Sequence, residues 1–284
     1  MAHHVKERVI LAPNPSPLTG PGTNSFLLGD RRLAVIDPGP NDSGHVQAIM
    51  DAAGTGQITH IFVTHAHLDH SGAAVALSRS TGAPILAFGD ATAGRSPAME
   101  RAVAAGLQGG GEGVDTGFSP DLTMRDGDVI ATDEWSLRAI HTPGHMGNHL
   151  SFATAGAAPS IYCGDVVMGW SSTLISPPDG DLADYFRSLA RLRSEGARRL
   201  LPAHGEPILN VTARLDELAT HRRARTAQIM AALRDGDTPE TLAARIYDVP
   251  PTLLPAAARN VLAHLLALAD LGAVRFDEGI WRPV

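Results

Sequence analysis

Cysteine is nearly absent from this sequence, with Cys163 the single example among 284 residues. One thiol excludes an intrachain disulfide framework and fits a reducing compartment. No continuous apolar run reaches the ~18–20 residues that cross a bilayer, and the opening MAHHVKERVI lacks the apolar core of a secretory signal. We therefore expect a cytoplasmic protein without a membrane partner.

Lysine and aromatic residues are also scarce. Lys6 is the only lysine, aromatic residues make up 5% of the chain, and the formal net charge is −7. Residues 211–284 hold nine basic and nine acidic side chains, so all of the excess acid lies in residues 1–210. This composition disfavours a protein that coats nucleic acid, which needs a basic surface and, for single strands, aromatic platforms.

Short β-type runs recur through the first 205 residues, with helical patterns between several of them. Residues 43–54 and 70–82 each end on a glycine that can cap a helix, and residues 181–195 repeat apolar positions at steps of three and four. This order predicts a mixed α/β (α+β) architecture in which helices cover the outer faces of sheets. The glycine-rich residues 106–121 predict a long surface loop at the rim of a site.

The pattern changes after about residue 210. Three helices are predicted there, over residues 215–235, 238–247 and 255–272. Two short strands are predicted around residues 277–279. Three helices followed by a hairpin is the order of a small winged-helix-like module. We therefore divide the chain into a large domain over residues 1–210 and a winged-helix-like domain over residues 211–284.

Histidine and aspartate crowd the segment THAHLDH at residues 64–70, directly after an apolar run. Three other motifs, HTPGH, YCGD and LPAHG, place the same residue types at a strand end or a glycine turn. Together the motifs supply seven candidate ligands: His65, His67, Asp69, His70, His145, Asp165 and His204. Imidazole and carboxylate suit Zn²⁺ and related divalent ions, and two ions that share a bridging group need about three protein ligands each. The sequence therefore predicts a dinuclear metal site.

These motifs, in this order, resemble those of the metallo-β-lactamase superfamily over residues 8–210. The segments NPSPLTGPGTNSFLLG, VIDPGP and HRRARTAQI, with the three-helix tail, further resemble the β-lactamase-like-protein-2 group, which includes a mitochondrial endoribonuclease and bacterial relatives. The resemblance implies an αββα sandwich with the metal site along one edge. It also implies the assignment of the ligands: one metal held by His65, His67 and His145, a second held by Asp69, His70 and His204, and Asp165 as the bridge.

The resemblance further implies hydrolysis by a metal-activated water or hydroxide at a carbonyl or phosphoryl centre. Asp69 is a candidate catalytic residue that receives the proton in transit. With no thiolate ligand, the set fits Zn²⁺ first, with Mn²⁺ or Fe²⁺ as alternatives. Asp37 either orients a histidine ligand or only forms a turn before Pro38. His149 either lines the pocket or only begins a strand.

Three functions stay open at this point. The favoured one is hydrolysis of a small-molecule substrate that carries an ester, thioester, lactone or lactam bond. The alternative is a metal-dependent endoribonuclease acting on single-stranded RNA, in which Arg222 and Arg225 hold phosphates from one helix face. For both arginines we favour a solvated helix face or salt bridges to the tail over phosphate binding. In the third, the tail binds DNA and the metal site is vestigial, although the balanced charge of the tail opposes this. A homodimer is expected by base rate alone.

Overall fold

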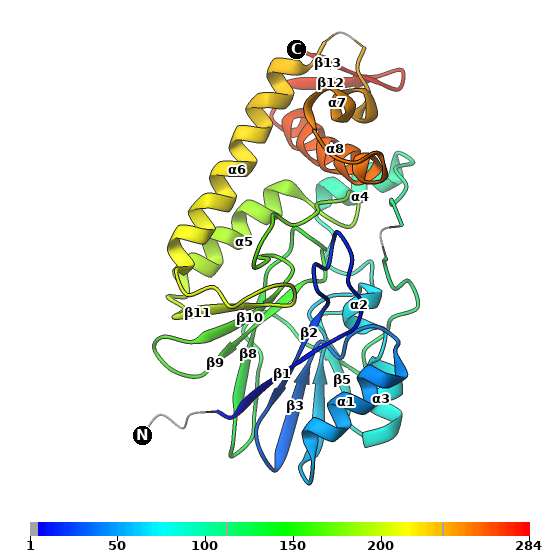
Figure 1. Ribbon diagram of the computed structural model, residues 1–284. Helices are drawn as coiled ribbons and strands as arrows, with labels where there is room; N and C mark the ends of the chain where they lie inside the picture. Colours follow the sequence, from blue (N-terminus) through cyan, green and yellow to red (C-terminus); the bar gives the residue numbers. More distant parts are fainter. Residues whose placement is uncertain (1–4, 112, 235) are drawn as a thin grey trace.

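Two β-sheets lie face to face in the larger part of the molecule (Figure 1). The computed structural model describes residues 5–111, 113–234 and 236–284. The first sheet has the order β1-β2-β3-β4-β5-β6, with strands Glu7–Leu11, Asn24–Leu28, Arg32–Ile36, Gln57–Phe62, Ile85–Ala87 and Leu122–Thr123. The second has the order β11-β10-β9-β8-β7, and β7 to β11 are Val129–Ala131, Ser136–His141, Leu150–Thr154, Ser160–Gly164 and Arg199–Pro202.

Helices cover the outer face of each sheet, and α1 to α6 span Ser43–Ala53, Leu68–Ser71, Ala74–Thr81, Pro97–Ala104, Leu182–Ser194 and Val211–Ala232. Helices α1 and α3 share a core with the first sheet through Ile49 and Leu77. Helix α5 and the first half of α6 share a core with the second sheet through Leu189 and Leu215. The αββα sandwich implied by the resemblance is therefore confirmed.

Alternation along the strands assigns each side chain to one layer. In β3, Leu33 and Val35 belong to the core under α1 and α3, whereas Ala34 and Ile36 belong to the core between the two sheets. Successive strand residues point to opposite faces, so a strand that is buried on both faces is apolar throughout. This explains why the apolar run in β3 is continuous rather than alternating.

The tail forms its own core at one end of the molecule (Figure 1). Its elements are the end of α6, then α7, the 3₁₀ turn η1, α8, β12 and β13, at Pro239–Ile246, Pro251–Leu253, Leu254–Asp270, Val274–Asp277 and Ile280–Pro283. Thr238 caps α7 in a reciprocal capping box with Thr241. The hairpin turns at Glu278 and Gly279, both with positive φ, as two-residue turns require. The three predicted helices and the hairpin are therefore present.

Helix α6 is shared by the two domains and begins where we placed the domain boundary. Its early residues Leu215 and Leu218 lie in the core of the second sheet, whereas Ile229 lies in the core of the tail. The C-terminal domain is thus tied to the sandwich by one continuous helix.

Among the described residues, Pro251–Asp270 is the one helical stretch long and apolar enough to cross a membrane by length and composition. It includes Arg259 and Asn260, so it is not a continuous apolar run. Val261, Leu265 and Leu268 lie in the core of the tail, as expected for the central helix of a small domain.

Three local features differ from the sequence-based expectation. Residues 70–82 do not form one helix, because α2 ends and α3 begins around Gly72, which lies so close to the backbone of Asn41 that no Cβ fits between them. Helix α4 is not among the predicted helices, although Ser96 followed by Pro97 is a helix-start signal. Strand β1 precedes NSFLLG, the first β-type run indicated by the sequence, and was not predicted because it is a half-exposed edge strand, with Val9 52% exposed.

Candidate metal centre

The four motifs meet at one edge of the sandwich because each follows the carboxyl end of a strand. His65 lies just beyond β4, His145 beyond β8, Asp165 directly after β10 and His204 beyond β11. These strands come from both sheets, so their ends meet where the two sheets open onto the tail. All seven predicted ligands are thereby brought within reach of one another. We call these seven residues the ligand cluster.

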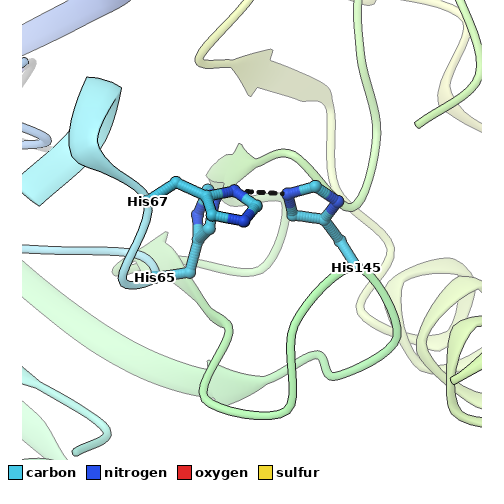
Figure 2. Close-up of side chains that lie close together, drawn as sticks. All are labelled: His65, His67 and His145. Carbon is cyan, nitrogen blue, oxygen red and sulfur yellow. Dashed lines mark hydrogen bonds between the residues drawn. The ribbon is translucent and has the colours of Figure 1, made fainter. Parts of the chain in front are cut away.

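Three histidines form the first half of the ligand cluster (Figure 2). His67 Nδ1 lies 2.9 Å from His65 Nε2 and 3.0 Å from His145 Nε2. The three rings therefore converge through one nitrogen each. The backbone of His67 is held by the glycine-rich loop, because His67 pairs with Val114 in an isolated β-bridge.

The second half contains a carboxylate. Asp69 Oδ2 lies 3.2 Å from His204 Nε2 and 3.4 Å from His70 Nε2. Asp165 stands between the two halves, with Oδ2 3.5 Å from His204 Nε2, 3.6 Å from His70 Nε2 and 3.7 Å from His145 Nε2. Among the described residues, three groups of ligand-type atoms lie within 4.8 Å of one another: His65, His67 and His145; His65, His70 and Asp165; and Asp69, His70 and His204. The first and the last of these are the trios that the resemblance implied, and Asp165 lies between them.

Outward hydrogen bonds fix the tautomers of the histidines. His145 Nδ1 donates to Leu174 O at 2.7 Å, and His204 Nδ1 donates to Gly22 O at 3.2 Å. A histidine that donates from one nitrogen presents the lone pair of the other nitrogen inward, as a metal ligand must.

Asp37 serves both halves of the ligand cluster from a buried position. Its Oδ2 accepts from His70 Nδ1 at 2.9 Å and from Thr64 Oγ1 at 2.8 Å, and its Oδ1 accepts from the Thr64 amide at 2.8 Å. Because the Thr64 hydroxyl donates to Asp37, it accepts from His65 Nδ1, 3.0 Å away. Of the two interpretations of Asp37, the geometry therefore favours a partner that orients ligands. Thr64 was not singled out from the sequence, because a threonine at a strand end is unremarkable there.

The ionisation of the histidines differs between the two halves of the ligand cluster. Burial, with His145 nearby, lowers the pKa of His67 to about 3. Burial also opposes protonation of His204, but the charge of Asp165 and hydrogen bonds to Asp165 and Asp69 outweigh it and raise the pKa of His204 to about 10. The first half is therefore neutral at pH 7, whereas the second holds protons against its carboxylates. A divalent cation would displace those protons on binding.

The cluster fits divalent metal ions. His70 Nε2 and Asp165 Oδ1 are buried and have no hydrogen-bond partner among the residues described. Buried polar atoms without partners are costly, and ligation would satisfy them. Cys163 is not part of the donor set, since its thiol is buried in the core beneath α5, donates to Val167 O at 3.3 Å and has a pKa raised by burial. The donors are all nitrogen and oxygen, which suits Zn²⁺, Mn²⁺ or Fe²⁺.

His149 is not among the residues that line the cavity over the cluster. Its side chain is fully buried behind the cluster, where it stacks on His65 with ring centroids 5.1 Å apart. Its Nε2 accepts from the Asp165 amide at 3.1 Å. Gly164 lets this approach occur, because a Cβ there would lie 2.6 Å from His149 Nε2. His149 thus supports Asp165 from behind, and the glycine of the YCGD motif has a packing reason.

The two arginines predicted to hold phosphates do not lie on a common exposed face. Arg222 is 1% exposed and donates to Thr173 O and to Asn260 Oδ1. Arg225 stacks over the Tyr247 ring at 4.0 Å, within the tail. The helix turns Arg222 inward against the sandwich, so neither phosphate binding nor a solvated face describes this residue.

A cavity of about 440 Å³ opens over the cluster. Its floor includes His67, Asp69, His145, Asp165 and His204, and Gly113 of the glycine-rich loop stands at its side. Its walls come from two segments, residues 16–19 and residues 168–174. Asp69 is 27% exposed, against 8% for Asp165, so Asp69 is the cluster carboxylate that a bound molecule meets first.

Comparison with known proteins places the chain in a family. The model of the metallo-beta-lactamase superfamily matches residues 18–204, and that of the beta-lactamase associated winged helix domain matches residues 238–281. The chain is 30% identical over 272 residues to the beta-lactamase-like protein 2 homolog of Caenorhabditis elegans, which covers 93% of this chain and 84% of that protein. It is 29% identical over 230 residues to an atrochrysone carboxyl ACP thioesterase of Aspergillus chevalieri, covering 80% of this chain and 65% of that protein.

A solved metallo-beta-lactamase family protein from Thermus thermophilus has the same fold, with a TM-score of 0.80, 24% identity and 98% of each chain covered. The chain therefore belongs to the metallo-β-lactamase superfamily and is a hydrolase of that superfamily. Its tail is the winged-helix domain associated with such enzymes, and proteins named β-lactamase-like protein 2 are among its relatives.

Proposed function

We propose that this protein is a dinuclear metal-dependent hydrolase of a small acyl substrate, with an ester, thioester, lactone or lactam bond. The observation that carries the proposal is the cavity over the ligand cluster. Met168, Trp170, Pro17 and Leu18 give it apolar walls, and no lysine or arginine lines it within the parts of the chain that the structure describes. Apolar walls with a few polar groups suit a small acyl ligand.

Each half of the ligand cluster would hold one ion. His65, His67 and His145 would hold the first, Asp69, His70 and His204 the second, and Asp165 would face both. We propose Zn²⁺ as the native metal, with Mn²⁺ or Fe²⁺ as alternatives for the same donors. When bound, such ions lower the pKa of a water molecule towards ~7 and stabilise negative charge on the substrate oxygen.

The residues of the chain position the reaction. Asp37, Thr64, Leu174 and Gly22 keep the ligand histidines in one tautomer and one orientation. Asp69 faces the cavity and is proposed to take the proton that the attacking water releases. Burial opposes its ionisation, but His70 and His204 outweigh burial and hold the pKa of Asp69 below its usual range. Asp69 is therefore an anion at neutral pH, as both a ligand and a proton acceptor must be.

A thioester is the first substrate to test. One relative is named an acyl carrier protein thioesterase, and an acyl chain would lie along the apolar wall at Trp170. RNA is less suited, since a phosphodiester chain needs cationic partners and Arg222 is buried away from the cavity. Single-stranded RNA is therefore the comparison substrate.

The test compares an acyl thioester with a fluorogenic single-stranded RNA, using metal-loaded wild type and His67→Ala. Thioester turnover that the variant loses, without RNA cleavage, supports the proposal. RNA cleavage that the variant loses, without thioester turnover, would overturn the substrate class and keep the metal centre. Equal turnover of either substrate by wild type and His67→Ala would show that the ligand cluster is not the catalytic site.

Location and assembly stay proposals. The single thiol is buried at Cys163, which fits a reducing compartment, and we propose the cytoplasm. A homodimer is proposed on frequency alone. Sedimentation of the purified chain tests the second proposal.

A further inference from the structure

One wall of the cavity is the segment that joins β10 to α5. We call residues 168–176 the pocket wall. Met168, Trp170, Ser171, Ser172, Thr173 and Leu174 of this segment all line the cavity. It contains no helix or strand between residues 168 and 176, so contacts with other parts of the chain must set its position.

The pocket wall also orients a metal ligand. His145 Nδ1 lies 2.7 Å from Leu174 O and 2.9 Å from Thr173 Oγ1. Since the opposite nitrogen, Nε2, faces His67 and Asp165, a shift of the wall turns the His145 ring within the ligand cluster. The wall therefore acts on both the substrate cavity and the first half of the cluster.

The C-terminal domain holds the part of the wall that contacts His145. Arg222 of α6 donates to Thr173 O, and its Nη1 donates to Asn260 Oδ1 at 3.1 Å. The same Asn260 oxygen accepts from the Ile175 amide at 3.1 Å. Residues 173 and 175, on either side of Leu174, are thus fixed by α6 and α8 respectively.

The two ends of the wall are held from the same side. Arg214 of α6 donates to Met168 O at 3.0 Å and to Ser171 O at 2.6 Å. Arg259 of α8 donates to Ser176 Oγ at 3.0 Å. Both arginines lie beyond residue 210, whereas the wall belongs to the sandwich.

We propose that Arg222, together with Asn260, is a positioning residue for the metal centre. It fixes Thr173 and Leu174, which orient His145, so α6 and α8, which carry the tail, set the geometry of a centre whose ligands all lie before residue 205. This inference rests on the proposed metal centre. It gives the tail a task other than covering the cavity or binding nucleic acid.

The surroundings of Arg222 favour a specific task over a contribution to stability. Its guanidinium is 1% exposed, forms no ion pair with a carboxylate in the described part of the chain, and leaves Nε without a partner. The Tyr185 ring, 5.5 Å away, is its one cation–π partner there. Burying an unpaired cation is costly, and an apolar side chain of similar shape is often tolerated in its place. Arg222→Met is therefore expected to fold.

The experiment uses the full chain with Arg222→Met, Arg222→Lys and the control Arg223→Met, which changes an exposed arginine on the next position of the same helix. Zinc affinity is measured by competition with a chromogenic chelator, and the visible spectrum of the cobalt-substituted protein reports ligand geometry. Thermal unfolding by circular dichroism checks the fold. Partners of metal ligands are typically worth about 10–100-fold in metal affinity or activity.

We expect Arg222→Met to weaken the binding of one zinc ion by about tenfold or more and to change the cobalt spectrum, while the Arg223→Met control matches wild type. Arg222→Lys, which keeps one donor for Thr173 O, should recover part of the loss. Wild-type affinity and spectrum in Arg222→Met would overturn the inference and leave the metal centre intact. Failure of the wild-type protein itself to bind zinc would overturn the proposed function instead.

Discussion

The ligand cluster and the pocket wall face the same cavity but are held by different parts of the chain. The seven ligands follow strand ends of the two sheets, and their partners Asp37 and Thr64 lie at the ends of neighbouring strands. The pocket wall has no regular structure of its own and depends on Arg214 and Arg222 of α6 and on Asn260 of α8.

This difference separates two properties of the enzyme. Strand ends in a packed sandwich hold side chains to a fixed geometry, so in the proposed function the sheets would provide the metal chemistry. A loop held by long side chains of other segments can shift with those segments, so α6 and α8 would set the shape of this wall of the substrate cavity. The ligand cluster and the pocket wall are joined by the contacts of His145 Nδ1 with Leu174 O and Thr173 Oγ1.

The largest effect is expected from the cluster itself. Substituting His67 or Asp165 by alanine removes a ligand from one half or the bridge between both. We expect zinc binding to fall and turnover to drop by more than the roughly 100-fold that a partner of a ligand costs, with the fold retained. Metal content by mass spectrometry and circular dichroism check this prediction. Full turnover in either variant would move the chemistry elsewhere.

Asp37→Asn comes next. All three groups that face the Asp37 carboxylate donate hydrogen bonds, from His70 Nδ1 and from the Thr64 hydroxyl and amide. The side-chain amide of asparagine would place its N–H group against one of these donors. Both His70, which contacts Asp37 directly, and His65, which is held through Thr64, would then lose their orientation. We expect about 10–100-fold weaker zinc binding or activity. Asp51→Asn, which changes an exposed carboxylate on α1, is the control. Unchanged zinc affinity in Asp37→Asn would contradict the role of Asp37 in orienting histidines of both halves of the cluster.

A smaller effect is expected from the wall. Trp170, 49% exposed at the cavity, should contact the acyl part of the substrate but not the reacting bond. In Trp170→Ala we expect KM for a thioester to rise about fivefold, on the order of 1 kcal/mol of lost apolar contact, with kcat little changed. Phe276→Ala, in the exposed hairpin of the tail, is the aromatic control. A fall in kcat with constant KM would place Trp170 in the chemistry.

The smallest effect concerns the tail alone. Asp237 accepts from Arg245 at 2.7 and 2.8 Å, and these hydrogen bonds lower the pKa of Asp237 to about 2. Because the folded-state pKa lies below the unfolded value of about 4, the stabilisation is present at neutral pH and is lost as the pH falls from about 4 towards 2. Asp237→Asn should lower the free energy of unfolding by on the order of 1 kcal/mol at pH 7.

Urea unfolding of wild type and Asp237→Asn between pH 7 and pH 3 measures that difference. The difference in the free energy of unfolding between wild type and Asp237→Asn should shrink below pH 4. Both proteins should bind zinc with the same affinity. A difference in the free energy of unfolding that is constant with pH would mean that the charge of the Asp237 carboxylate does not stabilise the tail. Weaker zinc binding would show that the metal centre senses the whole tail rather than Arg222 and Asn260.

The same contrast explains which features the sequence could reveal. His65, His67, Asp69 and His70 stand within six residues after an apolar run, so local spacing alone indicates a ligand group. Leu174 acts through its carbonyl, which any residue possesses. Arg222 and Asn260 reach the wall across 49 and 85 positions in the sequence.

The burial of Arg222 could not be predicted, because three arginines within HRRAR give no sign of which of them faces the core and which faces solvent. The position of His149 stayed open for a similar reason, since a histidine next to a strand start gives no sign of which side it faces. Sheets covered by helices and the helices of the tail were predictable, because apolar periodicity and caps are local, whereas the αββα sandwich was implied by the family resemblance. Edge strand β1 and the break at Gly72 were not, because packing against other segments decides both.

The most direct test of the account is metal content and thioester hydrolysis measured on the same sample of wild-type protein, before and after removal of metal by a chelator and again after zinc is restored. Two equivalents of zinc, loss of activity on removal and recovery on reloading are the expected results. Full activity in the metal-free protein would contradict the assignment of the ligand cluster as the catalytic centre.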